Sequence, residues 1–289
     1  MSTDPIVVGY DGSAGARTAL SWALDAAARH TVAVRLVYAV NRVLRSRPSP
    51  PMPGDTDRAA AHRNARAVLD SAIVEAERFP VDVSGEVLDG PAVSVLCDQS
   101  RHARCVVLGS RGLGGFTGMF VGSVSLRVAV HADGPVVVVR GEYPAQVTDL
   151  PVAVGVDDSA AAHDAIGFAM EEAAVRRVGV LAVRAWTPPS APWRSDIRPL
   201  VRDVAELETA EQHTLAEAVR GWREKYPTVS VSTKLVASDA RHALVAVSHD
   251  AQLIVVGSRG RGGFDGLLLG SVSQYLLHHA ACPVAVMRG

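Results

Sequence analysis

The feature that most constrains this sequence is that it is written twice. Residues 5–13 read PIVVGYDGS and return at 151–159 as PVAVGVDDS. The stretch 109–124, GSRGLGGFTGMFVGSV, returns at 257–272 as GSRGRGGFDGLLLGSV, with eleven of its sixteen positions identical. The offset grows from 146 residues (5 to 151) to 148 (109 to 257). A repeat this long indicates duplicated domains rather than the units of a solenoid.

Length and composition agree with a two-domain chain. The 289 residues suit two domains of ordinary size, and an apolar content of 48% is ample for two buried cores. We expect one domain at 1–141 and a second at 150–289. The polar segment GEYPAQVTDL at 141–150, which contains a proline, is the expected linker.

Short apolar runs alternate with longer amphipathic segments in each copy. The runs VVL at 106–108 and VVVV at 136–139 are not interrupted by polar residues, as is typical of strands covered by helices on both faces. This alternation predicts α/β domains with a doubly wound parallel sheet. In the first copy we expect strands near 5–11, 32–40, 82–88, 104–109 and 135–140, and helices near 14–30, 56–79, 91–102 and 122–132.

Charge and targeting signals exclude several classes of protein. The chain carries 29 Lys and Arg against 30 Asp and Glu, so no net field favours DNA, RNA or a membrane surface. The opening residues lack the basic and apolar segments of a signal peptide, and no apolar run approaches the length of a membrane span. Three scattered cysteines suggest neither a disulfide scaffold nor a zinc site. We therefore expect a cytoplasmic protein.

The repeated glycine-rich loop follows the fourth predicted strand and precedes a helix. Both copies fit the spacing G-x2-G-x9-G-S, which begins at Gly109 and at Gly257. Glycines permit positive φ and remove the Cβ that keeps a ligand away, so consecutive N–H groups can converge on an anion. Ser123 and Ser271 stand where a helix N-cap is expected, and a helix N-terminus favours phosphate. Arg111 and Arg259 add positive charge to the loops.

Two common phosphate-binding motifs do not fit these loops. No Walker A lysine follows the glycines, which excludes a P-loop. The Rossmann fingerprint belongs after the first strand, whereas these glycines follow the fourth.

An acid ends the first strand of each copy, at Asp11 and Asp157. Ligands of open α/β sheets bind outside the carboxyl ends of the strands, where an acid accepts hydrogen bonds from ribose or holds a metal on phosphates. The alternative is that the acid caps the next helix. Ser13 and Ser159 can cap equally well, which leaves the acids for a ligand.

Together these motifs resemble the universal stress protein family in its tandem, ATP-binding form, over almost the whole chain. The resemblance implies a flavodoxin-like sheet, related to the adenine nucleotide alpha hydrolases, with strand order 3-2-1-4-5. It implies that Asp11 faces Gly109 and approaches the ribose, and that the backbone of Ala39 or Ala185 contacts adenine. The expected nucleotide-binding residues are Asp11, Ala39, Gly109, Arg111, Gly112, Gly122, Ser123 and Val124, and in the second copy Asp157, Ala185, Gly257, Arg259, Gly260, Gly270, Ser271 and Val272.

The sequence departs from the family pattern after the third strand. The family often has Gly-x-Pro there, whereas the first copy has Gly90-Pro91 and the second has SDAR at 238–241. The second copy therefore lacks the family motif expected beside the adenine wall of its site. In the family, the fifth strands of two domains commonly pair. In this chain those strands are 136–139 and 284–287, so we expect an intramolecular pseudo-dimer. Association of two chains into a homodimer is the alternative.

The function implied by the resemblance is that of a stress or regulatory protein whose conformation or choice of protein partner depends on ATP, carried with Mg²⁺. We expect no resident metal site and no catalytic residue. One alternative is an enzyme, a slow ATPase or nucleotidyl transferase, although phosphoryl transfer requires a positioned base and cations that the loops do not supply. Another alternative is a protein that binds cyclic AMP.

Overall fold

The computed structural model describes residues 4–41, 54–112, 121–141, 149–188, 204–260 and 269–288, without the side chains of 54–57. The chain divides into two compact units, Met1–Val147 and Thr148–Met287. Residues 142–148, most of the expected linker, lie outside the described residues.

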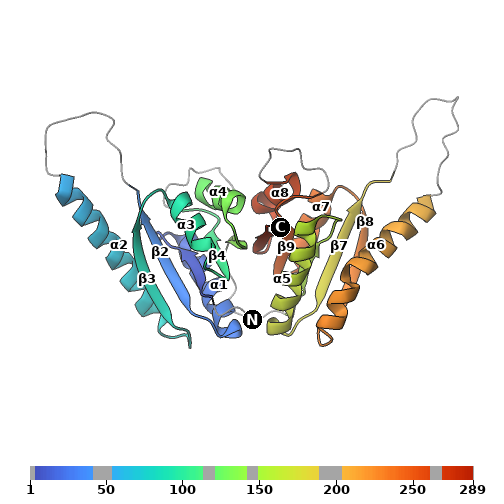
Figure 1. Ribbon diagram of the computed structural model, residues 1–289, viewed down its shortest axis with the longest axis horizontal. Helices are drawn as coiled ribbons and strands as arrows, with labels where there is room; N and C mark the ends of the chain where they lie inside the picture. Colours follow the sequence, from blue (N-terminus) through green and yellow to red (C-terminus); the bar gives the residue numbers. More distant parts are fainter. Residues whose placement is uncertain are drawn as a thin grey trace, which may run out of the picture. The chain divides into compact units, whose positions relative to one another are not determined.

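Strands and helices alternate through the first unit, as the apolar pattern predicts (Figure 1). The longest described helix, α2, begins two residues before the predicted start at 56 and ends three residues before the predicted end at 79. The elements are β1 (Ile6–Gly9), α1 (Ala14–His30), β2 (Val34–Val40), α2 (Gly54–Ala76), β3 (Val83–Asp89), α3 (Ala92–Ser100), β4 (Cys105–Gly109), α4 (Ser123–His131) and β5 (Val136–Val139).

The second unit repeats this order with one added 3-10 turn, Ser248–Asp250, after α7. Its elements are β6 (Val152–Gly155), α5 (Ala160–Arg176), β7 (Val180–Trp186), α6 (Val204–Lys225), β8 (Val231–Ala237), α7 (Ala240–Val247), β9 (Leu253–Gly257), α8 (Ser271–His279) and β10 (Val284–Met287).

Each unit has a five-stranded, fully parallel arrangement in the order 3-2-1-4-5. In the first unit the neighbours run β3-β2-β1-β4-β5. In the second they run β8-β7-β6-β9-β10. The predicted α/β class and strand order are confirmed. The chain reverses direction across the sheet between β1 and β4, and between β6 and β9, which are the switch points where such folds bind ligands.

Helices cover both faces of each sheet, which explains the uninterrupted apolar strands. In the first unit α1 and α2 pack on one face and α3 and α4 on the other (Figure 1). All five residues of β4 and all four of β5 are buried. Among the described residues, no helix has both the length and the apolar character needed to cross a membrane.

The end of β4 lies against the first turn of α1 with no side chain between them. A Cβ on Gly109 would overlap the backbone of Gly15, and a Cβ on Gly15 would overlap the carbonyl of Arg111. The second unit has the same approach at Gly257, where an added Cβ would lie 2.8 Å from the Cβ of Ala161. Both loops of the glycine motif therefore begin at a packing glycine.

We predict that Gly109→Ala lowers the free energy of unfolding by about 1–3 kcal/mol, because backbone must move to admit the methyl group. The control is Gly221→Ala in α6, where an added Cβ meets nothing within 4 Å. That change should raise stability by about 0.5–1 kcal/mol, because alanine loses less backbone entropy than glycine on folding. Urea unfolding followed by circular dichroism measures both. Equal effects of the two substitutions would contradict the steric role of Gly109.

Candidate functional site

Each unit has a cavity at its switch point, beside the carboxyl ends of the strands. The cavity is about 280 Å³ in the first unit and about 430 Å³ in the second. Every residue that the sequence predicted for a site lines the cavity of its own unit: Asp11, Ala39, Gly109, Arg111, Gly112, Gly122, Ser123 and Val124 in the first, and Asp157, Ala185, Gly257, Arg259, Gly260, Gly270, Ser271 and Val272 in the second.

The start of helix α4 forms one end of the first cavity. The helix begins at Ser123, and its first intrahelical hydrogen bond runs from the Leu126 N–H to the Gly122 carbonyl (3.1 Å). The amides of residues 123–125 precede that bond and have no partner within the helix. Helix α8 begins at Ser271 in the same way, with Gln274 donating to the Gly270 carbonyl (3.0 Å).

The expectation that Ser123 and Ser271 are N-caps is wrong. The caps are Gly122 and Gly270, in extended conformation with φ of −69° and −72°, and neither cap has a side chain to satisfy the helix. The serines are the first helical residues and are exposed. An absent cap side chain leaves the amides at the helix start open toward the cavity, which favours an anion there.

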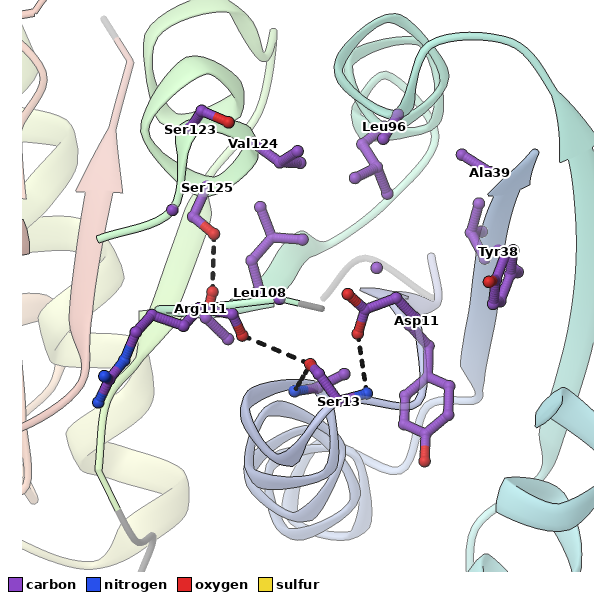
Figure 2. A pocket seen from close by; sticks show the side chains of 18 residues that line it. Asp11, Ser13, Tyr38, Ala39, Leu96, Leu108, Arg111, Ser123, Val124 and Ser125 are labelled. Atoms are coloured by element: carbon purple, nitrogen blue, oxygen red, sulfur yellow. Dashed lines mark hydrogen bonds between the residues drawn. The ribbon is translucent and has the colours of Figure 1, made fainter. Parts of the chain in front are cut away.

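A second serine follows each loop, in the first turn of the helix, and was not among the residues predicted from the motif. The Ser125 hydroxyl donates to the Gly109 carbonyl at 2.7 Å (Figure 2), and Ser273 donates to the Gly257 carbonyl at 2.8 Å. The Gly122 N–H donates to the Ser110 carbonyl at 2.6 Å, which joins the two ends of the loop. The signal was present, because both copies read GSVS at 122–125 and 270–273.

The carboxylate of Asp11 is held by a turn rather than by helix capping. Its Oδ1 accepts from the Ser13 N–H at 3.0 Å, while the Ser13 hydroxyl caps α1 by accepting from the Ala16 N–H at 3.1 Å (Figure 2). Asp157 is held in the same way by the Ser159 N–H (3.0 Å), and also accepts from the Ser159 hydroxyl (2.5 Å). The capping alternative for these acids is therefore wrong.

The second carboxylate oxygen of Asp11 faces Gly112. A Cβ on Gly112 would lie 2.6 Å from Asp11 Oδ2, and a Cβ on Gly260 would overlap Asp157 Oδ2. The carboxylate is thus opposite Gly112 and not, as the resemblance implied, opposite Gly109. None of the described loop glycines has a positive φ, because the glycines that do in the described chain are Gly12, Gly90 and Gly141.

Strand β2 continues past the end of β1 and presents backbone to the cavity. The Tyr10 N–H donates to the Val37 carbonyl (2.9 Å), so Val37 faces β1. Alternate residues of a strand face the same neighbour, so the N–H and C=O of Ala39 point to that side, beyond the last β1 pair, Gly9 with Val37. Ala185 has the equivalent position in the second unit. The Val156 N–H donates to the Val183 carbonyl, so Val183 faces β6, and Ala185 faces the same side beyond the end of β6 at Gly155.

The cavity walls between these polar ends are apolar. Val37, Leu96 and Leu108 line the first cavity, and Figure 2 shows the two leucines between Ser125 and Ala39. Val183, Leu244 and Val256 line the second. The second copy lacks the Gly-x-Pro pattern, but Ala240 and Leu244 of α7 line its cavity as Ala92 and Leu96 of α3 line the first.

The charge expected from Arg111 is not directed at the cavity. Arg111 lines the cavity, but its guanidinium extends away from Asp11 and Ala39 (Figure 2).

Burial, and secondarily repulsion from Arg111, lowers the pKa of Arg140 at the end of β5 below its ordinary value. Within the described residues, no group of three or more His, Cys, Asp or Glu side chains is arranged to hold a metal ion.

Comparison with known proteins gives a consistent result over the whole chain. The model of the universal stress protein family matches residues 2–140 and 151–288. A universal stress protein of Mycolicibacterium smegmatis is 35% identical over 289 residues, which cover 98% of this chain and 96% of that protein. One from Mycobacterium tuberculosis H37Rv is 35% identical over 294 residues, with the same coverage. The fold is similar to the crystal structure of a universal stress protein from Archaeoglobus fulgidus DSM 4304, with a TM-score of 0.76, 18% identity, and coverage of 100% and 99%.

Because Ser13 caps a helix and Ser123 does not, replacing each by alanine should lower the free energy of unfolding by different amounts. Ser13→Ala should lower the free energy of unfolding by about 1 kcal/mol, because the N-cap hydrogen bond is lost. Ser123→Ala should change it by less than about 0.5 kcal/mol, because that side chain is exposed and caps nothing. Urea unfolding compares the two variants directly. A cost for Ser123→Ala as large as that for Ser13→Ala would show that Ser123 is the cap after all.

Proposed function

The chain belongs to the universal stress protein family, and from this premise we propose that each of its two domains, 1–141 and 150–289, binds one adenine nucleotide, ATP, in its switch-point cavity. The observation that carries the proposal is that both cavities unite a helix start, an apolar wall and an overhanging strand end. These three features match the phosphates, the faces of the base and the edge of the base. Cavities of this kind typically enclose roughly 300–1,000 Å³; the first lies just below this range and the second within its lower half.

The phosphate end of the first site is the start of α4. The amides of Ser123 and Val124 are open to an anion, and the partial positive charge of the helix end adds to their attraction. The Gly122 N–H is already donated to Ser110, so Gly122 contributes by the absence of a side chain. The second site has the same arrangement at Gly270 and Ser271.

The adenine end is the overhang of β2. Adenine offers a donor and an acceptor on adjacent atoms of one edge, and the N–H and C=O of Ala39 supply the complementary pair. The apolar side chains of Leu96 and Leu108 suit the faces of the base. The equivalent overhang at Ala185 supports the same recognition in the second domain.

One carboxylate in each site faces the middle of the ligand. Asp11 Oδ2 suits a ribose hydroxyl, or a magnesium ion that is held mainly by the phosphates. Magnesium commonly uses one or two carboxylates together with substrate phosphates, so a single aspartate is a fitting set for Mg-ATP. Asp157 is the corresponding group in the second site.

We infer that the output of binding is a ligand-dependent conformation or choice of protein partner rather than turnover. Among the described residues that line the cavities there is no lysine or histidine, and Asp11 and Asp157 are the only acids. Both acids are already held by turns through Oδ1. Phosphoryl transfer needs a positioned base together with cationic stabilisation of the transferred group.

We predict that calorimetry finds two ATP molecules per chain. Gly122→Ala should remove one and Gly270→Ala the other, because each methyl group enters the phosphate end of its cavity. Both variants should fold, because an added Cβ at Gly122 lies 3.5 Å and at Gly270 3.3 Å from the nearest backbone atom outside its chain neighbours. Gly221→Ala, far from either loop in sequence and open at its Cβ, should still bind two.

Two results would overturn parts of this assignment. One ATP per chain, unaffected by Gly270→Ala, would show that the second loop is kept for its shape alone. Tighter binding of cyclic AMP than of Mg-ATP in the same titration would replace ATP as the ligand, since a cyclic phosphate makes less use of the helix start.

We also predict that ATP hydrolysis is far slower than the ~1–100 s⁻¹ of kinases, because no base is positioned. Release of phosphate from Mg-ATP, followed under single-turnover conditions, measures the rate. The matched variants are Asp11→Asn and Asp157→Asn, which should weaken binding and leave the slow rate nearly unchanged. Turnover near 1 s⁻¹ that either variant abolishes would assign the chain to the enzymes instead.

A further inference from the structure

A buried arginine lies directly behind the second site. Arg184, in β7, has a side chain that is only 4% exposed. Its Nη1 and Nη2 donate to the two carboxylate oxygens of Asp158, at 3.0 and 3.2 Å, and its Nε donates to Glu211. The guanidinium therefore joins β7, the turn between β6 and α5, and helix α6.

Both carboxylates of this cluster retain access to water. The side chain of Asp158 is 47% exposed and that of Glu211 is 27% exposed. Burial opposes the charge of Arg184, but its hydrogen bonds to Asp158 and Glu211 outweigh that effect and raise its pKa above the ordinary value. The arginine is thus charged at any ordinary pH.

Arg184 and its partner Asp158 are the chain neighbours of the two groups proposed to hold the nucleoside. Asp158 follows Asp157, whose carboxylate faces the ribose, and Arg184 precedes Ala185, whose backbone faces the base. The bidentate Arg184–Asp158 contact fixes the separation of these two chain segments. A bidentate arginine–carboxylate pair has a defined planar geometry, so it specifies position as well as attraction.

Among the residues that the structure describes, the first domain has no counterpart to this cluster. The positions equivalent to Asp158 and Arg184 are Gly12 and Tyr38, neither of which carries a charge. Gly12 has φ +79°, and a Cβ there would lie 3.0 Å from Val68 of α2. The Gly12 carbonyl accepts from Arg17 of α1 at 2.6 Å, so the turn that carries Asp11 is held within its own segment, whereas the turn that carries Asp157 is tied to β7 by the pair of Arg184 and Asp158.

Buried ion pairs contribute little net stability, since the cost of desolvation offsets the attraction, and their best-attested use is to fix one arrangement. A cluster at this position is therefore better explained by geometry than by stability. We propose that Arg184 is a positioning residue for the second site: it sets the distance between Asp157 and Ala185, so that ATP affinity there depends on ion pairs that the first site lacks. This inference rests on the proposed nucleotide sites.

The test is a double-mutant cycle in a chain that also carries Gly122→Ala, so that only the second site binds. Calorimetry measures the dissociation constant for Mg-ATP with Arg184→Met, with Asp157→Asn, and with both. Arg184→Met should weaken binding about tenfold. In the Asp157→Asn background the same change should weaken it less than about threefold, because the group that Arg184 positions is already lost.

Two further variants separate positioning from a loss of fold. Asp158→Asn removes the charge that pairs Arg184 with the turn, at a half-exposed side chain, and should weaken binding at least threefold with little change in melting temperature. Arg220→Met removes an arginine from an exposed ion pair with Glu217 on the same helix, α6, and should leave affinity unchanged. Circular dichroism establishes that each variant is folded.

The outcomes distinguish this inference from the proposed function. Unchanged affinity in both Arg184→Met and Asp158→Asn would overturn the positioning role while leaving the site intact. An equal tenfold loss with and without Asp157→Asn would also overturn it, because Arg184 would then act independently of that aspartate. Absence of ATP binding in the Gly122→Ala parent and in the wild-type chain would overturn the nucleotide sites themselves, and the inference with them.

Discussion

Both domains depend on a steric constraint, the close approach of the strand that follows the switch point to the first turn of α1 or α5. Gly109 and Gly15 meet backbone to backbone in the first domain, and Gly257 meets Ala161 in the second. This contact fixes where β4 and β9 end relative to the helix caps at Ser13 and Ser159. The position of the glycine loop and the closing hydrogen bonds of Ser125 and Ser273 follow from it.

The sites that result are built largely from backbone. Helix amides face the expected phosphates, and a strand end that continues past its neighbour faces the expected base. A side chain is required chiefly at the aspartate, and at the loop glycines it is the absence of a side chain that matters. This reliance on backbone supports the proposal that the protein responds to a nucleotide rather than consuming one.

The two domains share this framework but differ in the polar contacts of the helix that follows the second strand, α2 in the first domain and α6 in the second. In the first, Arg58 and His62 of α2 contact Asp89 at the end of β3, and the hydrogen bond from His62 is the largest effect lowering the pKa of Asp89. This cluster is partly exposed. In the second, the buried Arg184 of β7 contacts Glu211 of α6 and Asp158 next to the site, and both of these carboxylates are also partly exposed. Duplication kept the loops nearly identical while the supporting contacts diverged, so the two sites need not respond alike.

Periodicity and motif spacing alone were enough to predict the duplication, the parallel α/β class, the glycine loops and the acids at the ends of the first strands. Ala39 and Ala185 were predicted only through the family resemblance, and they also line the cavities. The sequence also indicated the serines that cap α1 and α5. It could not assign roles within the loop. Whether Ser123 or Gly122 caps α4, and whether Gly109 meets a ligand or a helix, depends on atoms distant in sequence. The bond between Arg184 and Asp158 was likewise invisible, because 26 residues separate the partners and only the sheet register brings them together.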